Sequence, residues 1–361
     1  MIYKWGELIA LEYGKPVKDK ARTDGQYPVY GTNGQIGTSN LTPLCDHPSF
    51  ILGRKGAYRG VHYSSVPFSV IDTAFYAVNL HPDILDIKWA YYRFLTYDIN
   101  SMDSGSAIPS TDRYEIYAIE VDLPAIDEQK REVKLLECFD DKIANITEIN
   151  DNLQQQAATL YGKYFPYTVT DDLPAGWCVG TVGEIVEIHD SKRIPLSGAQ
   201  RAKMEKRIYP YYGAASLMDY VDEYIFDGKY LLLGEDGTVV DDAGYPILQY
   251  VWGQFWVNNH AHILTGKLGF NVESLLLLFK RTPVKSIVTG AVQPKISQAN
   301  LRSIQVVVPP QPELDAFNEL IRPLFDQIRQ NQDQNKALAS LRDALLPKLM
   351  SGEVDVSSIQ L

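Results

Sequence analysis

Residues 105–110 read GSAIPS, and residues 290–295 repeat this stretch in altered form as GAVQPK. A second pair of signatures, aliphatic runs that end in Gly-x-x-Gly, closes at Gly56 and at Gly237, at nearly the same offset along the chain. Solenoid repeats have periods of roughly 20–50 residues, so this period is far too long for one. The sequence therefore predicts a duplicated pair of domains and a function that needs two copies of one domain.

Looser echoes extend the duplication toward the start of each half. Residues 29–31 read VYG and residues 211–213 read YYG, while WGEL at residues 5–8 is echoed by WCVG at residues 177–180. Small loop insertions account for the drift in the offsets. The duplication is therefore predicted to include the whole of each half.

Composition and charge limit the class of protein. The chain has 361 residues, which indicates about two or three domains. Its three cysteines are isolated, without metal-ligand or disulfide spacing, and its start lacks a signal pattern, so we expect a cytoplasmic protein. The longest apolar run, residues 275–279, is too short to span a membrane.

The charge distribution leaves room for a local nucleic-acid surface. A net charge of −11 argues against a protein whose whole surface binds nucleic acid. Residues 191–207, however, carry six basic residues against one acidic residue. This segment predicts a basic face, or alternatively an exposed basic loop without a partner.

Each half is divided into a mixed part and a helical part. The mixed parts are rich in Tyr and Gly, with strand-like runs such as residues 114–121 and one helix-like stretch each, at 84–95 and 275–280. The predicted segments are a first mixed domain at 1–124, a long helix at 125–163, a second mixed domain at 164–309, and a second long helix with a C-terminal tail at 310–361.

The two helical parts carry narrow apolar stripes at alternating steps of three and four residues, each interrupted by asparagine, as in a coiled-coil seam. The first seam consists of Leu136, Phe139, Ile143, Ile146, Asn150, Leu153 and Leu160, and the second of Phe317, Ile321, Leu324, Ile328, Asn335, Leu338 and Leu345. Asn150 and Asn335 are separated by the same offset as the GSAIPS and GAVQPK stretches, and a buried Asn pair fixes coiled-coil register.

We predict that the two helices pair with each other in antiparallel fashion, because the chain enters a compact domain between them and must return. The alternative is two separate amphipathic helices, each lying on its own domain. The predicted fold class is α+β: two similar small mixed α/β domains, separated by two long helices that form an antiparallel coiled coil, with internal pseudo-two-fold symmetry.

The order of these features resembles the specificity (S) subunit of type I restriction–modification systems. The features are the Tyr-Gly segments, the Gly-x-x-Gly runs, the GSAIPS and GAVQPK stretches, NNHAHIL at residues 258–264, the long helices and the tail LLPKLMSGE at residues 345–353. The resemblance spans essentially the whole chain.

The resemblance implies a non-catalytic subunit with two target recognition domains, each reading one half of a bipartite asymmetric DNA target. It implies that the helices set the gap between the half-sites and dock two methyltransferase subunits, through which restriction (motor-nuclease) subunits join. The chain itself then needs no cofactor, because S-adenosylmethionine, ATP and magnesium belong to the partner subunits. Apolar residues off the seams are candidates for the docking or for contact with the chain's own domains: Val133, Leu135, Ile149, Leu320 and Leu341.

The sequence offers no convincing catalytic or metal site. It has no Walker A motif, no Gly-x-Gly-x-x-Gly that opens a helix, and no Asn-Pro-Pro-aromatic signature of amino-methyltransferases. His260 and His262 would share one face of a strand and could bind a metal, but no third ligand lies near them in sequence. We predict no metal and no catalytic residue.

For DNA contact we expect loop residues with basic, amide and hydroxyl groups, because such groups bind phosphates and base edges. The candidates are Asn33, Arg54, Lys55, Tyr58, Arg59, Ser106 and Ser110 in the first half, and Lys192, Arg193, Arg201, Lys203, Lys229, Gln293 and Lys295 in the second. The second half has Glu235-Asp236 where the first has Arg54-Lys55, which predicts different half-sites.

Two other functions remain open at this stage. A duplicated scaffold could tether two protein partners without touching DNA, and the negative net charge favours this slightly. An enzyme with an unfamiliar site in the Tyr-rich domains has no positive support beyond scattered carboxylates.

Overall fold

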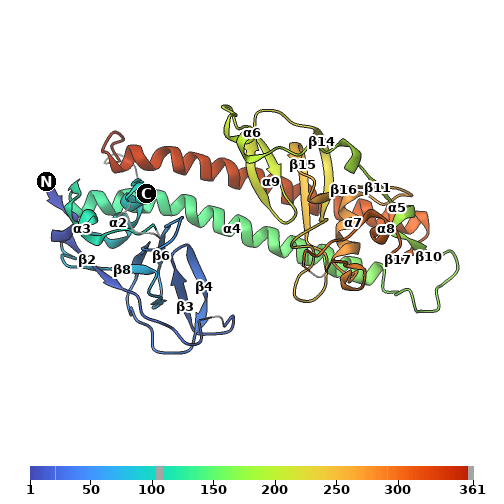
Figure 1. Cartoon of the computed structure of the whole chain (residues 1–361), viewed down its shortest axis with the longest axis horizontal. Helices are drawn as coiled ribbons and strands as arrows, with labels where there is room; N and C mark the ends of the chain where they lie inside the picture. The colour runs from blue at the N-terminus through green and yellow to red at the C-terminus, as the bar shows by residue number, and fades with distance from the viewer. Residues whose placement is uncertain (21, 103–108, 291, 357–361) are drawn as a thin grey trace. The chain divides into compact units, whose positions relative to one another are not determined.

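The computed structural model describes residues 1–20, 22–102, 109–290 and 292–356 (Figure 1). The chain forms two compact units. The first unit comprises Met1–Ile146 and Asp333–Leu361, and the second comprises Thr147–Gln332. The unit boundaries fall inside both long helices, whereas the four predicted segments end at the helix termini. The reason is that each half of each helix packs on the mixed domain of its own unit.

The mixed part of the first unit contains nine short strands and three α-helices. In chain order they are β1 (Ile2–Lys4), α1 (Trp5–Leu8), β2 (Ile9–Tyr13), β3 (Tyr27–Gly31), β4 (Gly34–Ser39), β5 (Ser49–Gly53), β6 (Val61–Ser64), β7 (Ser69–Val70), β8 (Ala74–Asn79), α2 (Ile87–Phe94), a 3-10 turn (Ile99–Ser101), α3 (Arg113–Ala118) and β9 (Glu120–Asp122). These counts refer to the described residues. The strands form sheets of order β2-β8-β5-β6, β4-β3-β7 and β1-β9.

The core of the first unit is aromatic. The ring of Trp5 lies 4.7 Å from that of Phe94, and Phe50 of β5 lies 4.8 Å from the same ring. The predicted helix at 84–95 is α2, which begins after Asp86 because the Asp86 carboxylate accepts hydrogen bonds from two backbone N–H groups of the first turn. This packing places α2 against β5 and β6 and leaves the strand ends free to carry loops.

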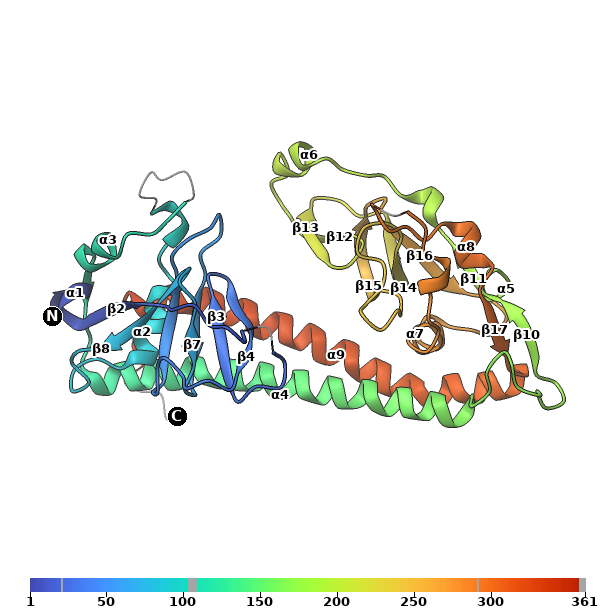
Figure 2. The same ribbon diagram turned by 60° about the horizontal axis from the view of Figure 1, so that its bottom comes forward.

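The second unit repeats this plan with longer strands. Its elements are β10 (Cys178–Thr181), α5 (Val182–Ile185), β11 (Val186–Ile188), a 3-10 turn (Asp190–Lys192), α6 (Gly198–Ala202), β12 (Tyr209–Tyr212), β13 (Leu217–Val221), β14 (Phe226–Gly234), β15 (Leu248–Val257), β16 (Ala261–Gly266), α7 (Val272–Phe279), a 3-10 turn (Lys285–Ile287), α8 (Gln298–Arg302) and β17 (Gln305–Val308). The six-stranded sheet has the order β11-β16-β14-β15-β12-β13 (Figure 2). In the second unit the single strand β15 pairs with both β14 and β12. In the first unit two separate strands make the corresponding pairs: β6 pairs with β5, and β7 pairs with β3.

One predicted echo is wrong. The counterpart of WGEL at residues 5–8 is VGEI at residues 182–185, and not WCVG at 177–180, because α1 and α5 occupy the same place in the two units. Both helices are single turns closed by a glutamate that accepts a hydrogen bond from the backbone N–H three residues earlier, at 2.7 Å in each case. The shared Gly-Glu-aliphatic sequence was the correct signal, and the repeated tryptophan was a coincidence.

A second expectation also fails in part. Residues 114–121 look strand-like, but Arg113–Ala118 forms α3 and only Glu120–Asp122 forms a strand, β9. The Asp112 carboxylate accepts a hydrogen bond from the backbone N–H of Tyr114 at 2.9 Å and starts the helix. A local cap has here overridden the β propensity of the Tyr and Ile side chains.

The long helices are α4 (Ile126–Tyr164) and α9 (Gln311–Met350), close to the predicted ranges. Their pairing is antiparallel, as predicted. In the second unit Tyr161 packs on Phe317 with ring centroids 5.5 Å apart, and in the first unit Asp140 accepts a hydrogen bond from Arg342 at 2.6 Å. All fourteen predicted seam residues are buried or half-buried.

The seam asparagines show the internal duplication at the level of single hydrogen bonds. In the second unit the Asn150 amide donates to the backbone oxygen of Ile328 at 3.2 Å, and in the first unit Asn335 donates to that of Ile143 at 3.3 Å. The offset from Ile143 to Ile328 equals that from Asn150 to Asn335. Asn150 also accepts a hydrogen bond from Asn331 at 2.8 Å, so the buried pair is Asn150–Asn331 and not Asn150–Asn335.

A buried carboxylate on α4 makes the stability of the first unit dependent on pH. Glu132 is 1 % exposed, accepts a hydrogen bond from the Trp89 indole at 2.5 Å, and corresponds to the apolar Phe317 in the other helix. Burial raises the pKa of Glu132 to about 7. Because the folded state then binds this proton more tightly than the unfolded state, stability falls as the pH rises from the unfolded pKa to about 7.

We expect Glu132→Gln to stabilise the first unit at pH 8 by about 2–3 kcal/mol and to have little effect near pH 4.5. The glutamine oxygen keeps the Trp89 hydrogen bond without a buried charge. Hydrogen exchange of the α2 amides at the two pH values measures the difference. The exposed Glu120→Gln is the control, and an equal effect of both variants would contradict the assignment.

Candidate nucleic-acid interface

The two sequence signatures that revealed the duplication contact each other in both units. In the first unit the backbone N–H of Gly56 donates to the carbonyl of Pro109 at 3.0 Å, and in the second Gly237 donates to Pro294 at 3.0 Å. Next to these bonds Lys55 forms an isolated antiparallel β-bridge with Ser110, and Asp236 forms one with Lys295. We call this arrangement the loop pair: residues 53–60 with 109–111 in the first unit, and residues 234–241 with 292–296 in the second.

The loop pair is built by backbone groups, so its shape does not depend on the side chains it presents. The N–H of Thr111 donates to the carbonyl of Arg54 at 2.9 Å, and the N–H of Ile296 donates to that of Glu235 at 2.8 Å. Both turning glycines have positive φ, 129° at Gly56 and 82° at Gly237, a conformation that other residues adopt only with strain. The glycines are therefore explained by geometry, and the neighbouring positions are free to vary.

Strand register and helix starts match four positions beside the loop pair of the first unit with four positions in the second unit. At each of these four positions the two units carry different residues. In the first unit they are Tyr13 on β2, Arg54 after β5, Phe75 on β8 and Arg113 at the start of α3. In the second unit they are Asp190 after β11, Glu235 after β14, His262 on β16 and Gln298 at the start of α8. The same framework therefore presents two different chemistries.

The first unit presents cations and aromatic rings at these positions. The Arg54 guanidinium carbon lies 4.7 Å from the centroid of the Tyr13 ring, and that of Arg113 lies 5.0 Å from the same centroid. Such cation–π contacts hold the guanidinium groups without neutralising them. Among the described residues, neither arginine forms an ion pair.

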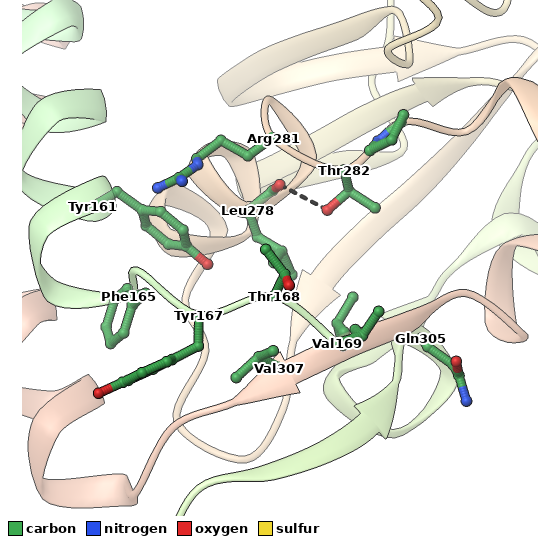
Figure 3. Close-up of a pocket in the computed structure, with 12 residues that line it drawn as sticks. Tyr161, Phe165, Tyr167, Thr168, Val169, Leu278, Arg281, Thr282, Gln305 and Val307 are labelled. Atoms are coloured by element: carbon green, nitrogen blue, oxygen red, sulfur yellow. Dashed lines mark hydrogen bonds between the residues drawn. The ribbon is translucent and has the colours of Figure 1, made fainter. Parts of the chain in front are cut away.

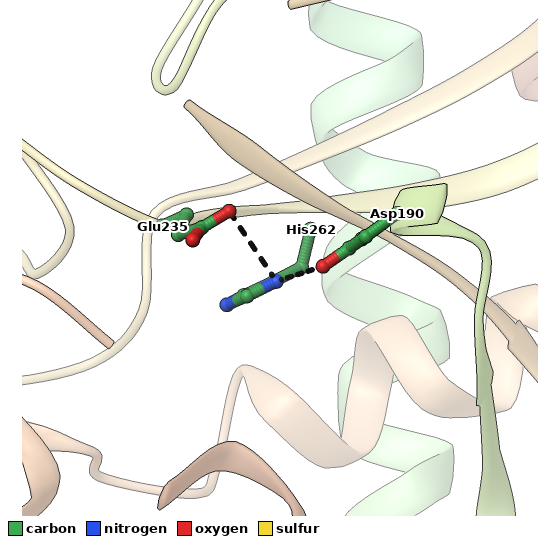
Figure 4. A group of neighbouring side chains, drawn as sticks. All are labelled: Asp190, Glu235 and His262. Carbon is green, nitrogen blue, oxygen red and sulfur yellow. Dashed lines mark hydrogen bonds and ion pairs between the residues drawn. The ribbon is translucent and has the colours of Figure 1, made fainter. Parts of the chain in front are cut away.

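The second unit presents a closed network of charges (Figure 4). The Asp190 carboxylate accepts hydrogen bonds from the N–H of Ile263 at 3.0 Å and from Gln298 at 2.6 Å, and it faces the His262 ring at 2.6 Å. Arg193 donates to Glu235 at 2.6 Å and lies 3.4 Å from Asp190.

Asp190, Glu235 and His262 are close enough together to hold a metal ion, but their hydrogen bonds do not fit one. Nδ1 of His262 faces the Asp190 carboxylate and Nε2 faces the carbonyl of Ile296 at 2.8 Å. Both ring nitrogens of His262 therefore already face an acceptor within the unit, whereas a metal requires a free ring nitrogen. His260, the other histidine that could bind a metal by its spacing, lies in the turn before β16 and pairs with Asp236.

The network also sets the ionisation of its acids. Burial by itself would raise the pKa of Asp190, but the hydrogen bond and charge of His262 outweigh it and hold the pKa below its usual value. The pKa of Glu235 is likewise lowered, because Arg193 and His262 outweigh its burial. Both acids are therefore ionised at neutral pH, and the network stabilises the turn after β11.

The predicted contact residues of the first unit differ in how exposed the structure leaves them. Asn33, Lys55 and Tyr58 are exposed at turns, and Arg54 is half-buried on Tyr13. Ser110 is half-buried in the loop pair, and Ser106 lies outside the described residues. Arg59 is a correction: it is 2 % exposed and donates to the carbonyl of Asn100 at 2.7 Å, so its side chain cannot touch DNA without movement.

The predicted contacts of the second unit divide in the same way. Lys192, Lys203 and Gln293 are exposed. The others are tied up: Arg193 by Glu235, Arg201 by Asp219 at 3.0 Å, Lys229 by Glu273 at 2.7 Å and Lys295 by Glu235 at 3.2 Å. Arg193 and Arg201, whose side chains are at most 17 % exposed, are held by ion pairs within the unit, so a contact of either with DNA stays a prediction.

Sequence reasoning missed Tyr13, Arg113 and Asp190. Arg113 could have been found, because it precedes Gln298 by the same offset that separates the GSAIPS and GAVQPK stretches. Tyr13 and Asp190 gave no such signal, because the strand register that aligns them is visible only in the structure.

A pocket of about 250 Å³ lies elsewhere in the second unit, between the end of α4, α7 and β17 (Figure 3). It is lined by aromatic and aliphatic side chains such as Tyr161, Phe165 and Leu278, with Arg281 at its edge. None of the predicted DNA contacts lines it. Of the described helices, none combines the length and the apolar composition needed to cross a membrane.

Comparison with known proteins gives a consistent result. A family model described as "Type I restriction modification DNA specificity domain" matches residues 1–155 and again residues 174–339. The type I restriction enzyme MjaIX specificity subunit of Methanocaldococcus jannaschii is 24 % identical over 308 residues, which cover 75 % of this chain and 70 % of that protein. A putative type I restriction enzyme specificity subunit of Haemophilus influenzae is 32 % identical over 141 residues, 39 % of this chain and 34 % of that protein.

Among solved structures, the type I restriction–modification S subunit of M. genitalium has the same fold. It superposes with a TM-score of 0.56 over 97 % of this chain and 95 % of that one, at 19 % sequence identity. At this identity the likeness establishes the architecture and leaves the chemistry of the loops to be argued from this chain's own residues.

Proposed function

Because the chain belongs to the family of type I restriction–modification DNA specificity subunits, we propose that each of its units reads one half of a bipartite, asymmetric DNA target. The loop pairs and the turns beside them make the contacts. The chain carries no catalytic group of its own in this proposal, and two methyltransferase subunits supply S-adenosylmethionine and the methyl transfer. Restriction subunits, with ATP and magnesium, join through these.

The observation that carries the proposal is the duplicated loop pair. Its backbone hydrogen bonds are the same in both units, while the side chains around it differ at all four corresponding positions. A protein that recognises two different DNA sequences with one fold needs this combination of a constant backbone and different side chains.

The two long helices are proposed to set the gap and to dock the methyltransferase subunits. Of the five off-seam apolar residues, Val133 is buried and Leu135 half-buried in the core of the first unit, so they serve the chain's own packing. Ile149, Leu320 and Leu341 are exposed to 44, 39 and 51 % and remain candidates for docking.

The competing role is a scaffold that tethers two proteins and does not touch DNA. The exposed helix residues are compatible with both roles. Arg54 and Arg113 on Tyr13, which form no ion pair among the described residues, favour DNA, because free guanidinium groups are suited to phosphates.

Long-read sequencing that detects methylated bases tests the proposal. DNA from cells that carry this chain with its neighbouring methyltransferase is compared with DNA from cells that lack only this chain. We expect a methylated bipartite motif that disappears with the chain. An unchanged methylation pattern, with the methyltransferase shown to be active, would favour the tether.

A further inference from the structure

Four cations of the first unit lie at or beside its loop pair and are not neutralised. Arg54, Lys55, Arg59 and Arg113 form no ion pair among the described residues. We call these four residues the basic cluster. Arg54 donates a hydrogen bond to the backbone carbonyl of Asp72 at 3.2 Å, and the Asp112 carboxylate caps α3.

Several N–H groups in this region also lack a partner within the part of the chain that the structure describes. They are Nε and Nη1 of the buried Arg59 and Nε of Arg113. Burying a guanidinium without a counter-charge is costly, and unpaired N–H groups add to the cost. The corresponding part of the second unit has Val239, fully buried, where the first has Arg59 next to the glycine at the end of the central strand. Packing therefore does not require an arginine at this position.

Exposed aromatic rings accompany the cations. Tyr13 is 42 % exposed, and the guanidinium groups of Arg54 and Arg113 both lie over its ring. Tyr58, in the same loop as Arg54, is 61 % exposed. Guanidinium groups bind phosphate oxygens in a bidentate manner, and a ring beneath them limits their conformations. The group most compatible with this combination is a phosphodiester backbone.

In the second unit the charged groups at the corresponding place are paired with one another. Glu235 accepts Arg193 and Lys295 together, and Asp190 balances His262. The exposed tip of its loop pair carries Val292, 99 % exposed, and the amide of Gln293. Neither group carries a charge that attracts phosphate.

We propose that the two loop pairs have unequal tasks: Arg54, Lys55 and Arg113 of the basic cluster bind the DNA backbone in the first unit, with the buried Arg59 behind them, whereas the second loop pair contacts its half-site without a phosphate contact from the corresponding residues. The proposal rests on the proposed DNA-specificity function. It adds a division of labour between the two units, in which only the first loop pair binds phosphates through its cations. The exposed Lys192 and Lys203 belong to a separate segment of the second unit, between β11 and β12, and lie outside its loop pair.

Salt dependence of binding separates the two loop pairs, because each phosphate contact contributes about 0.9 to the slope of log K against log salt. The protein is the full chain assembled with its methyltransferase subunits, and the probe is a duplex that carries the methylated motif. We compare wild type with the triple variant Arg54→Gln, Lys55→Gln, Arg113→Gln. The control triple variant is Lys163→Gln, Lys267→Gln, Arg302→Gln, which removes the same charge from exposed positions away from the loop pair.

We expect the slope to fall by about 2–3 in the first triple variant and to stay at its wild-type value in the control. The charge-conserving variant Arg54→Lys, Arg113→Lys keeps the slope and guards against a folding defect. A wild-type slope in the glutamine variant, or an equal fall in the control, would overturn the division of labour while leaving specific binding intact. No specific binding by the wild-type complex would overturn the proposed function as well.

Discussion

Lengthening both long helices by one heptad should lengthen the gap between the two half-sites without changing the half-sites themselves. One heptad is inserted before Asn150 in α4 and one after Asn331 in α9, so that the Asn150–Asn331 hydrogen bond is kept. A heptad adds about 10 Å to a helix pair and preserves its seam. Because DNA rises about 3.4 Å per base pair, the gap should grow by up to about three base pairs.

Sequencing of methylated DNA from cells with the lengthened chain measures the gap directly. The control is Glu148→Ala, an exposed substitution at the insertion point that leaves the helix length unchanged. Insertion into α4 alone should abolish the methylated motif, because it shifts the seam of one helix against the other. An unchanged gap in the doubly lengthened chain would contradict the role of the helices as a spacer.

Removing the carboxylate at the centre of the second unit's network should destabilise that unit by about 3–5 kcal/mol. Asp190→Ala leaves the ring of His262 and the amide of Gln298 without their partner in a buried site. Hydrogen exchange of the β16 amides reports the loss, and the exposed Asp242→Ala is the control. A cost below about 1 kcal/mol would mean that the network is not the support described here.

The Asp190–His262 pair of this network can also be replaced by uncharged residues. Asp190→Tyr combined with His262→Phe introduces the residues that the first unit has at these positions, and should recover most of the lost stability because no buried charge is left unpaired in this pair. The pH dependence has a defined sign. Since the pKa of Asp190 is lowered in the folded state, its contribution is present above the unfolded pKa and is lost as the pH falls through the folded pKa.

The sequence was most informative where the structure is periodic. The pairing of the two long helices followed from the heptad spacing, because a seam residue must face a partner at every turn. Its antiparallel direction followed from the compact domain that lies between the helices in the sequence. The partner of Asn150 did not follow. Duplication relates Asn150 to Asn335, but in the antiparallel pair the residue opposite Asn150 is Asn331, which depends on the relative shift of the helices.

The candidate site was predicted less well, for a physical reason. Sequence singles out basic residues in loops but does not show which acids lie beside them in space. Arg193 and Arg54 were equivalent as candidates, yet Arg193 pairs with Glu235, 42 positions away, and Arg54 pairs with no acid among the described residues. Arg59 illustrates the same limit, because burial of its side chain against the turn at Asn100 could not be inferred from its loop position.

The central claim, that each unit reads its own half-site, is tested most directly by sequencing methylated DNA from cells with variants of one unit at a time. The first variant is Asn33→Ala with Tyr58→Ala, and the second is Lys192→Ala with Gln293→Ala, all at exposed turns or loops. We predict that the first variant alters or relaxes one half of the methylated motif and the second alters the other half, with the gap unchanged in both. Variants that each changed both halves, or that both changed the same half, would contradict the account.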